Sequence, residues 1–474
     1  MAVHLAFAAV VANAQESEAE QSIEAAAKEA AEESVDLSIG HIELAEELEV
    51  STEITLDHQN IVQQNKLEAE TGDAAQDELE PEASESSYQE TISVAGGGSS
   101  SVGAELVNLD KEVSPLLNID FELRFTDRLK DRKHTFNSRT GIAFSVDYSF
   151  LAQQASSSST EKSAGSDVFR VFGNWMALGD LLGTNGNLVF KYEHRAAIWG
   201  RQTPRDLGFA TGSALSTANY KENGWGWTDL YWKQVLGGGK YVFLLGHMDP
   251  GDWADQHSLL NAWTDLLSDA FYNNPAEAIP KRATSLVGRM VFGDGWYSAF
   301  GVHDSNGKDN HLDFKQVFET PELFTWVEIG RAPNDFSGIG ETTHLHYWHQ
   351  DTRVAAGVAE SWGLTASRSK EHDNGYTTVM RIGYSEGDAA QMRRFVGLAV
   401  SKKIRFSDRL LLGIGWGSPP DKSLGSQTVL EALYRLQLTN HVVVSPDLQI
   451  TFDPSFDTTK SVVYVFGLRF RMTF

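Results

Sequence analysis

The last stretch of the chain, residues 461–474, alternates strictly between apolar and mixed positions. Even-numbered positions from Val462 to Phe474 are all apolar or aromatic, whereas the odd-numbered ones include Arg469 and Arg471. Successive side chains of a β-strand point to opposite faces, so the pattern predicts a strand with one wholly apolar face. A terminal strand ending in an aromatic residue is typical of membrane-spanning barrels, in which every backbone amide must be paired.

Residues 188–198 and 428–438 show the same alternation. Over the three segments the apolar parity holds 19 residues and no charge, whereas the other holds 16 residues and seven charges. Similar runs, separated by turn signals at roughly 10–30 residue spacing, continue to the end of the chain. We predict an all-β, 16-stranded antiparallel transmembrane barrel, because an even count brings both ends to the same side. The strands are expected to start near Gly141, Val168, Leu188, Gly224, Tyr241, Thr284, Gly295, Leu323, Thr342, Val354, Thr377, Phe395, Leu410, Thr428, Val442 and Val462.

The connections in this pattern alternate between short glycine-rich or polar turns and longer loops, as expected for periplasmic turns and outside loops. On that register, Phe466→Arg should block assembly, whereas Val465→Arg should insert normally. Composition agrees with a barrel, since 41 glycines, 12 tryptophans and 25 phenylalanines accompany a complete lack of cysteine. No run of about 18 apolar residues exists, which excludes a spanning helix.

The first 139 residues have a different composition. Residues 1–14 resemble a secretory signal peptide that ends at Ala14, although the basic segment at its start is missing; a buried N-terminal helix is the alternative. Residues 15–101 form an acidic low-complexity periplasmic segment, partly helical or disordered, with a Gly/Ser hinge. In 15–95, 23 Asp and Glu face two Lys, so −21 of the chain's −26 lies there. We expect this segment to be dispensable for conduction, residues 102–139 to form a short helical segment at the barrel mouth, and 140–474 to form the barrel.

Several short motifs along residues 140–474 resemble the carbohydrate-selective porins of the OprB type, in their order and spacing. They are Gly173-Asn174-Trp175, Gly224 to Trp232, Gly246-His247-Met248-Asp249, Ala359 to Gly363, Glu431 to Arg435 and Ser445 to Gln449. The resemblance implies an outer-membrane barrel of a Gram-negative bacterium that admits sugars by passive diffusion. The segment before the barrel departs from the family, because the expected Trp-Gly-Gly element is absent and the acidic segment has no counterpart.

A porin of this kind needs a lumen with polar groups that replace the water around a sugar. Strand parity assigns to the lumen Lys191, Glu193, Arg195, Asp229, Tyr231, Lys233, Arg289, Glu328, Arg381, Glu431, Arg435, Asp447, Gln449, Arg469 and Arg471. The alternative for each charged position is an ion pair that braces the inner wall.

The longest connection, Pro250 to Arg282, is expected to fold into the barrel as a constriction loop. Its apolar residues recur at three- and four-residue spacing, which predicts a short amphipathic helix against the inner wall. Acidic groups would then face wall arginines such as Arg195, Arg435 and Arg469; a cap over the mouth or a latch between protomers is the alternative. The residues assigned to this loop's site are Asp252, Asp255, Trp263, Asp265 and Asp269.

No cofactor, nucleic acid or catalytic activity is expected. His344, His346, His349 and Asp351 do not match a compact metal motif, and we assign no metal site. The expected partners are outer-membrane lipid, sugars and the barrel assembly machinery, the last through Phe474, and the oligomeric state is left open between trimer and monomer. The alternatives are a general or anion-selective porin, a secreted polysaccharide-binding β-protein, and a barrel enzyme or adhesin.

Overall fold

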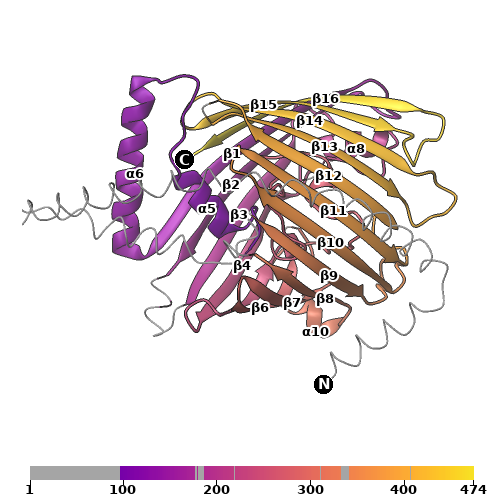
Figure 1. Ribbon diagram of the computed structural model, residues 1–474, viewed down its shortest axis with the longest axis horizontal. Coiled ribbons are helices and arrows are strands. Elements are labelled where there is room, and N and C mark those ends of the chain that lie inside the picture. The colour runs from indigo at the N-terminus through magenta and orange to yellow at the C-terminus, as the bar shows by residue number, and fades with distance from the viewer. Residues whose placement is uncertain are drawn as a thin grey trace, which may run out of the picture. The chain divides into compact units, whose positions relative to one another are not determined.

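A closed barrel of sixteen antiparallel strands forms the body of the computed structural model (Figure 1). The structure describes residues 97–176, 179, 186–217, 219–309, 311–332, 341–405 and 407–474. The strands are β1 (Ile142–Ala155), β2 (Ser163–Trp175), β3 (Gly186–Ala197), β4 (Gly224–Leu236), β5 (Tyr241–Met248), β6 (Ala283–Gly293), β7 (Trp296–Asp304), β8 (Leu323–Arg331), β9 (Thr342–Gln350), β10 (Ser361–Glu371), β11 (Tyr376–Glu386), β12 (Arg394–Lys403), β13 (Arg409–Ser418), β14 (Gln427–Gln437), β15 (Val442–Phe452) and β16 (Val462–Thr473).

Each strand pairs with its neighbours in sequence, and β1 pairs with β16 to close the sheet. At this seam Phe474 exchanges backbone hydrogen bonds with Val146, 2.8 and 2.9 Å long. Closure leaves no unpaired strand edge. The predicted fold class is therefore confirmed. The barrel has two distinct ends: the turn end, where β1 begins and β16 finishes, and the loop end, which carries the long connections.

Outward and inward side chains alternate along the strands as predicted. On β16, Phe466 is 58% exposed and Leu468 is 48% exposed, whereas Arg469 is 1% exposed. Val465 lies inside the barrel as predicted and packs with Leu207 of α8 (Pro204–Ala210), a neighbour that the prediction for Val465→Arg did not consider. An arginine there would overpack a closed apolar cluster.

Fourteen of the sixteen predicted strand starts lie within two residues of the observed ones, and two do not. The tenth strand starts at Ser361 and not near Val354, because residues 353–358 form a tight turn closed by hydrogen bonds between Arg353 and Val358. The second starts at Ser163 and not near Val168, since polar residues assigned to a loop pair with β1. Both errors arise where pairing, and not local hydropathy, decides the strand.

From residue 97 onward, where the structure describes the chain, two helices precede the barrel, α5 (Val102–Asp110) and α6 (Asp120–Thr140). Both lie toward the turn end in Figure 1, with α5 beside β1–β3 and α6 beyond the rim. Phe136 of α6 packs edge-on against Phe144 of β1, with ring centroids 5.5 Å apart. At the loop end, α10 (Gln316–Glu319) is a single turn. The signal peptide and residues 15–96 of the acidic segment lie outside the described residues.

None of the helices in the described part of the chain has the length and apolarity that a membrane crossing requires.

Candidate functional site

The connection between β5 and β6 fills the middle of the barrel. Of residues 250–280, all but three are buried. The segment contacts strands on opposite sides of the closed sheet: Asp252 pairs with Lys191 of β3, Trp348 of β9 donates to the carbonyl of Ala276, and Glu431 of β14 binds the backbone at Leu267. A buried segment that touches strands all around a closed sheet lies inside it. A cap over the mouth is therefore excluded.

The predicted amphipathic helix is wrong. Helical structure in the segment is confined to η2 (Pro250–Asp252) and α9 (Asp269–Tyr272). The apolar residues do pack inward, where Leu259, Trp263, Leu266, Leu267 and Phe271 join a cluster with wall residues. A helix is not required because side chains of the wall form hydrogen bonds with the backbone of the segment. The Glu431 carboxylate accepts from the N–H groups of Leu267 and Ser268, at 2.5 and 2.9 Å, and supplies acceptors that a helical turn would otherwise provide.

Arg469 holds the same stretch from β16. Its guanidinium donates to the carbonyl oxygens of Ala262 and Asp265, at 2.7 and 2.9 Å. Two charged wall residues from strands far along the chain thus bind four backbone groups of the segment. Hydrogen bonds to charged groups each contribute about 1.5–3 kcal/mol, so these contacts fix its path.

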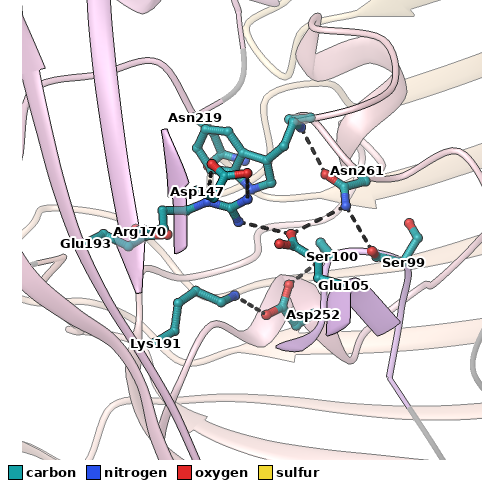
Figure 2. A network of polar contacts seen from close by, with 12 residues as sticks. Ser99, Ser100, Glu105, Asp147, Arg170, Lys191, Glu193, Asn219, Asp252 and Asn261 are labelled. Atoms are coloured by element: carbon teal, nitrogen blue, oxygen red, sulfur yellow. Dashed lines mark hydrogen bonds and ion pairs between the residues drawn. The ribbon is translucent and has the colours of Figure 1, made fainter. Parts of the chain in front are cut away.

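The acidic residues of the segment have other partners than those predicted. Asp252 pairs with Lys191 at 3.1 Å, and Asp255 pairs with Arg381 at 2.8 Å and with His344 at 2.6 Å. Figure 2 shows the Asp252–Lys191 pair and its neighbours. Burial, offset in part by Lys191, raises the pKa of Asp252 to about 7. The carboxylate of Asp265 lies 3.5 Å from Arg409. Buried Asp269 is the first residue of α9, which Ser268 caps, and its N–H donates to the carbonyl of Ser216.

The predicted wall arginines are engaged elsewhere. Arg195 pairs with Glu193 at 2.7 Å and lies 5.2 Å from the ring centre of Trp263, and Arg435 donates to Gln437 at 3.2 Å. Of these three arginines, Arg469 donates hydrogen bonds to the segment, through the carbonyl oxygens of Ala262 and Asp265, whereas Arg195 contacts it at the Trp263 ring. The pairing failed because strand parity gives the face of a residue but not its height in the barrel.

All of the predicted lumen residues lie on inward-facing positions. Most are tied into local pairs. Lys191 contacts Asp229 at 2.9 Å, and Glu193 also contacts Arg282 at 3.3 Å. The other contacts are Tyr231 and Lys233 with the Trp253 ring, Arg289 with the Tyr297 ring, Glu328 with Tyr297 and His346, Arg381 with Ser367, Asp447 with Gln449, and Arg471 with Asp147.

A polar cavity of about 200 Å³ lies beside the segment, toward the loop end of the barrel. Asp249, Lys221 and Asp309 contribute to its charge, and none of them was singled out from the sequence. Burial, followed by the charge of Arg282, lowers the pKa of Lys221 to about 8. Although burial opposes it, the cations Arg282 and Lys221 lower the pKa of Asp309 to about 2. The other polar lining groups include Arg205, Asn219, Asp269, Asn273, Asn274, Glu277 and Gln391.

A second polar cavity, of about 420 Å³, lies at the turn end. Its charged lining includes Glu105 of α5, Asp265 of the segment, and Arg409, Arg435 and Arg471 of the wall. Glu105 was missed because residues 102–139 were assigned no site. The spacing of Val102, Leu106 and Leu109 was the available signal for an inward helix face. Among the residues predicted for the lumen and the loop, Asp265, Asp269, Arg435 and Arg471 reach these two cavities.

Each histidine of β9 contacts a carboxylate, and Glu328 lies near both His344 and His346, at 3.9 and 3.2 Å. His344 meets Asp255, His346 meets Glu277 at 2.9 Å, and His349 meets Glu360 at 2.8 Å. Across the described ranges, no three His, Asp or Glu side chains converge as metal ligands would.

Comparison with known proteins agrees with the geometry. Residues 177–474 match the family model described as carbohydrate-selective porin, OprB family. Among solved structures, the chain is similar to Pseudomonas putida OprB at high pH, with 14% identity, a TM-score of 0.56, and coverage of 72% of this chain and 96% of that one. An anion-selective porin from Comamonas acidovorans gives 10% identity, a TM-score of 0.43, and coverage of 70% and 99%. A search of curated proteins found no match.

Proposed function

The chain belongs to the OprB family of carbohydrate-selective porins, and we propose that solutes cross its barrel past a constriction formed by Pro250–Arg282. The protein is an outer-membrane porin for the passive diffusion of sugars and other small hydrophilic solutes. The observation that carries the proposed path is that the inward segment lines both polar cavities, one toward each end of the barrel.

The groups around the two cavities suit a polyhydroxylated neutral solute. Carboxylates such as Asp265 and Asp269 accept hydrogen bonds from hydroxyl groups, whereas Arg435 donates to them. Both signs of charge lie close together, so a sugar exchanges its water for hydrogen bonds of either kind. These three residues are proposed to contact the solute.

The remaining predicted residues are proposed to shape the passage indirectly. Lys191, Arg381, Glu431 and Arg469 hold the inward segment, and so set the width of the passage. Charged partners in pairs also keep the interior polar. This assignment favours bracing over direct solute contact for most of the wall.

The orientation in the membrane follows from the connections. Short turns at one end and long loops at the other match the periplasmic and outer sides of such barrels. We therefore assign the N-terminal segment to the periplasm, and Phe474, bound into the seam, to recognition by the barrel assembly machinery. The number of protomers stays open between one and three.

Deleting Ser258–Ala270 tests the constriction. These residues occupy the middle of the barrel, so their loss should raise single-channel conductance in planar bilayers and reduce discrimination between small and large sugars in liposome swelling. Removing the exposed turn residues Asp421–Ser423, which lie between β13 and β14, serves as the control. Unchanged conductance and unchanged sugar discrimination in the folded deletion variant would refute the proposed path. Reversal potentials recorded alongside distinguish sugar diffusion from anion selectivity.

A further inference from the structure

Residues 97–110 enter the barrel interior ahead of the first strand. In this inner plug, defined here as Gly97–Asp110, the side chains of Val102, Ala104, Glu105 and Leu106 are buried. Glu105 is 2% exposed although it carries a charge. The plug lies outside residues 177–474, so the family match assigns it no role.

The plug is fastened to the constriction segment at three points, which Figure 2 shows in part. Ser100 Oγ donates to Asp252 Oδ1 at 2.7 Å, and Asn261 Nδ2 donates to the carbonyl of Ser99 at 2.9 Å. The N–H of Gly98 donates to the carbonyl of Asp252 at 2.9 Å. A Cβ at Gly98 would lie 1.2 Å from Gln256 Oε1, so the approach requires glycine. Plug and constriction segment thus form one packed unit.

Glu105 also completes a charge cluster on the wall. Its Oε1 lies 3.0 Å from Arg170 Nη1, and its Oε2 lies 3.8 Å from Arg471 Nη2. Asp147 binds both arginines as well. Two carboxylates, from α5 and β1, therefore balance two guanidinium groups, from β2 and β16. Without Glu105, one positive charge would remain without a counter-charge in the cluster.

Glu105 lines the turn-end cavity together with Asn261 and Asp265. Its Oε2 is buried and has no hydrogen-bond donor among the described residues. Because a buried charge is costly unless it is paired, Arg170 and Arg471 are the groups that stabilise this carboxylate beside the cavity.

We propose that the inner plug is a second selectivity element of the pore, in which the charge of Glu105 suppresses anion passage. The inference rests on the proposed passage of solutes through the barrel. It goes beyond it by assigning specificity to a residue that precedes the barrel. The contacts with Arg170 and Arg471 fix the carboxylate beside the turn-end cavity.

Glu105→Gln in the full-length protein is the direct test, because it removes the charge and preserves the shape. A unit charge about 10 Å away in water changes local anion and cation concentrations about twofold in opposite directions. We therefore expect the anion-to-cation permeability ratio, from reversal potentials across a KCl gradient, to rise about fourfold.

Three further variants separate a charge effect from misfolding. Glu105→Asp keeps the charge and should keep the wild-type permeability ratio, whereas Glu105→Gln combined with Arg471→Gln restores the balance and should return the ratio toward wild type. Asp373→Asn removes an exposed charge in the turn between β10 and β11, outside the cavity lining, and should leave the ratio unchanged. Heat-modifiable migration on gels verifies folding of each variant.

An unchanged permeability ratio in folded Glu105→Gln would overturn the proposal. An equal shift in Asp373→Asn would overturn it too, because the effect would then arise from surface charge in general. If the wild-type protein carried no sugar flux, that result would instead contradict the porin function itself. The two failures are therefore distinguishable.

Discussion

Arginine placed at three depths on the outward face of β16 measures the register of the barrel in the membrane. Leu468 and Phe466 lie near the middle of the strand Val462–Thr473, and Val462 lies at its loop end. All three share the outward parity, so the substituted group is the same and only its depth differs. Leu468→Ala, Phe466→Ala and Val462→Ala control for the lost apolar side chain.

The expected penalties follow from the strand geometry. A rise of about 3.4 Å per residue at a tilt of about 40° moves the chain about 2.6 Å along the membrane normal. Leu468 then lies about 1 Å and Phe466 about 4 Å from the level of the strand centre, against about 14 Å for Val462. Arginine costs about 2–4 kcal/mol near the midplane and about 0–1 near the interface. The folding constant should fall roughly 30- to 1000-fold for the two central variants and less than tenfold at Val462.

Reversible folding into large unilamellar vesicles, followed by tryptophan fluorescence during a urea titration, gives these free energies. A graded order of Leu468, Phe466 and Val462 is the expected result. Equal penalties at Val462 and Leu468, or a negligible penalty at Leu468, would show that this face does not meet hydrocarbon.

Two other predictions concern the interior. Glu431→Gln leaves one oxygen to accept from Leu267 and Ser268, so about 2–3 kcal/mol of stabilisation of the constriction segment should be lost. Bilayer recordings should then show a higher and noisier conductance, and an unaltered trace would contradict the anchoring role of Glu431. Because the pKa of Lys221 is about 8, its charge is present at pH 7 and lost as the pH rises to 9. The chloride-to-potassium permeability ratio, from reversal potentials, should fall over that window in the wild type and not in Lys221→Met. A parallel fall in both proteins would assign the titration to another group.

Local patterns in the sequence predicted the wall well, since the inward or outward direction of a strand residue depends only on its parity. Phe466 and Arg469 could be assigned for that reason. The helix expected at Leu259–Phe271 failed because its spacing ignores the surroundings, and the segment is enclosed by strands that replace helical hydrogen bonds. Ion-pair partners such as Asp255 and Arg381 lie 126 residues apart and depend on which loop enters the barrel. Sequence periodicity carries no information on that choice.

The position of Glu105 has a consequence for the order of assembly. Its two arginines belong to β2 and β16, and so lie on either side of the β1–β16 seam, the last junction available for closure. Before β16 pairs with β1, Arg471 is absent from the cluster, so fewer contacts hold the plug inside the barrel. Seating of the plug and sealing of the cylinder therefore favour each other, since each supplies a charge that the other needs. A barrel that closed with the plug outside would keep one positive charge without a counter-charge at the β1–β16 seam, where Asp147 alone faces Arg170 and Arg471.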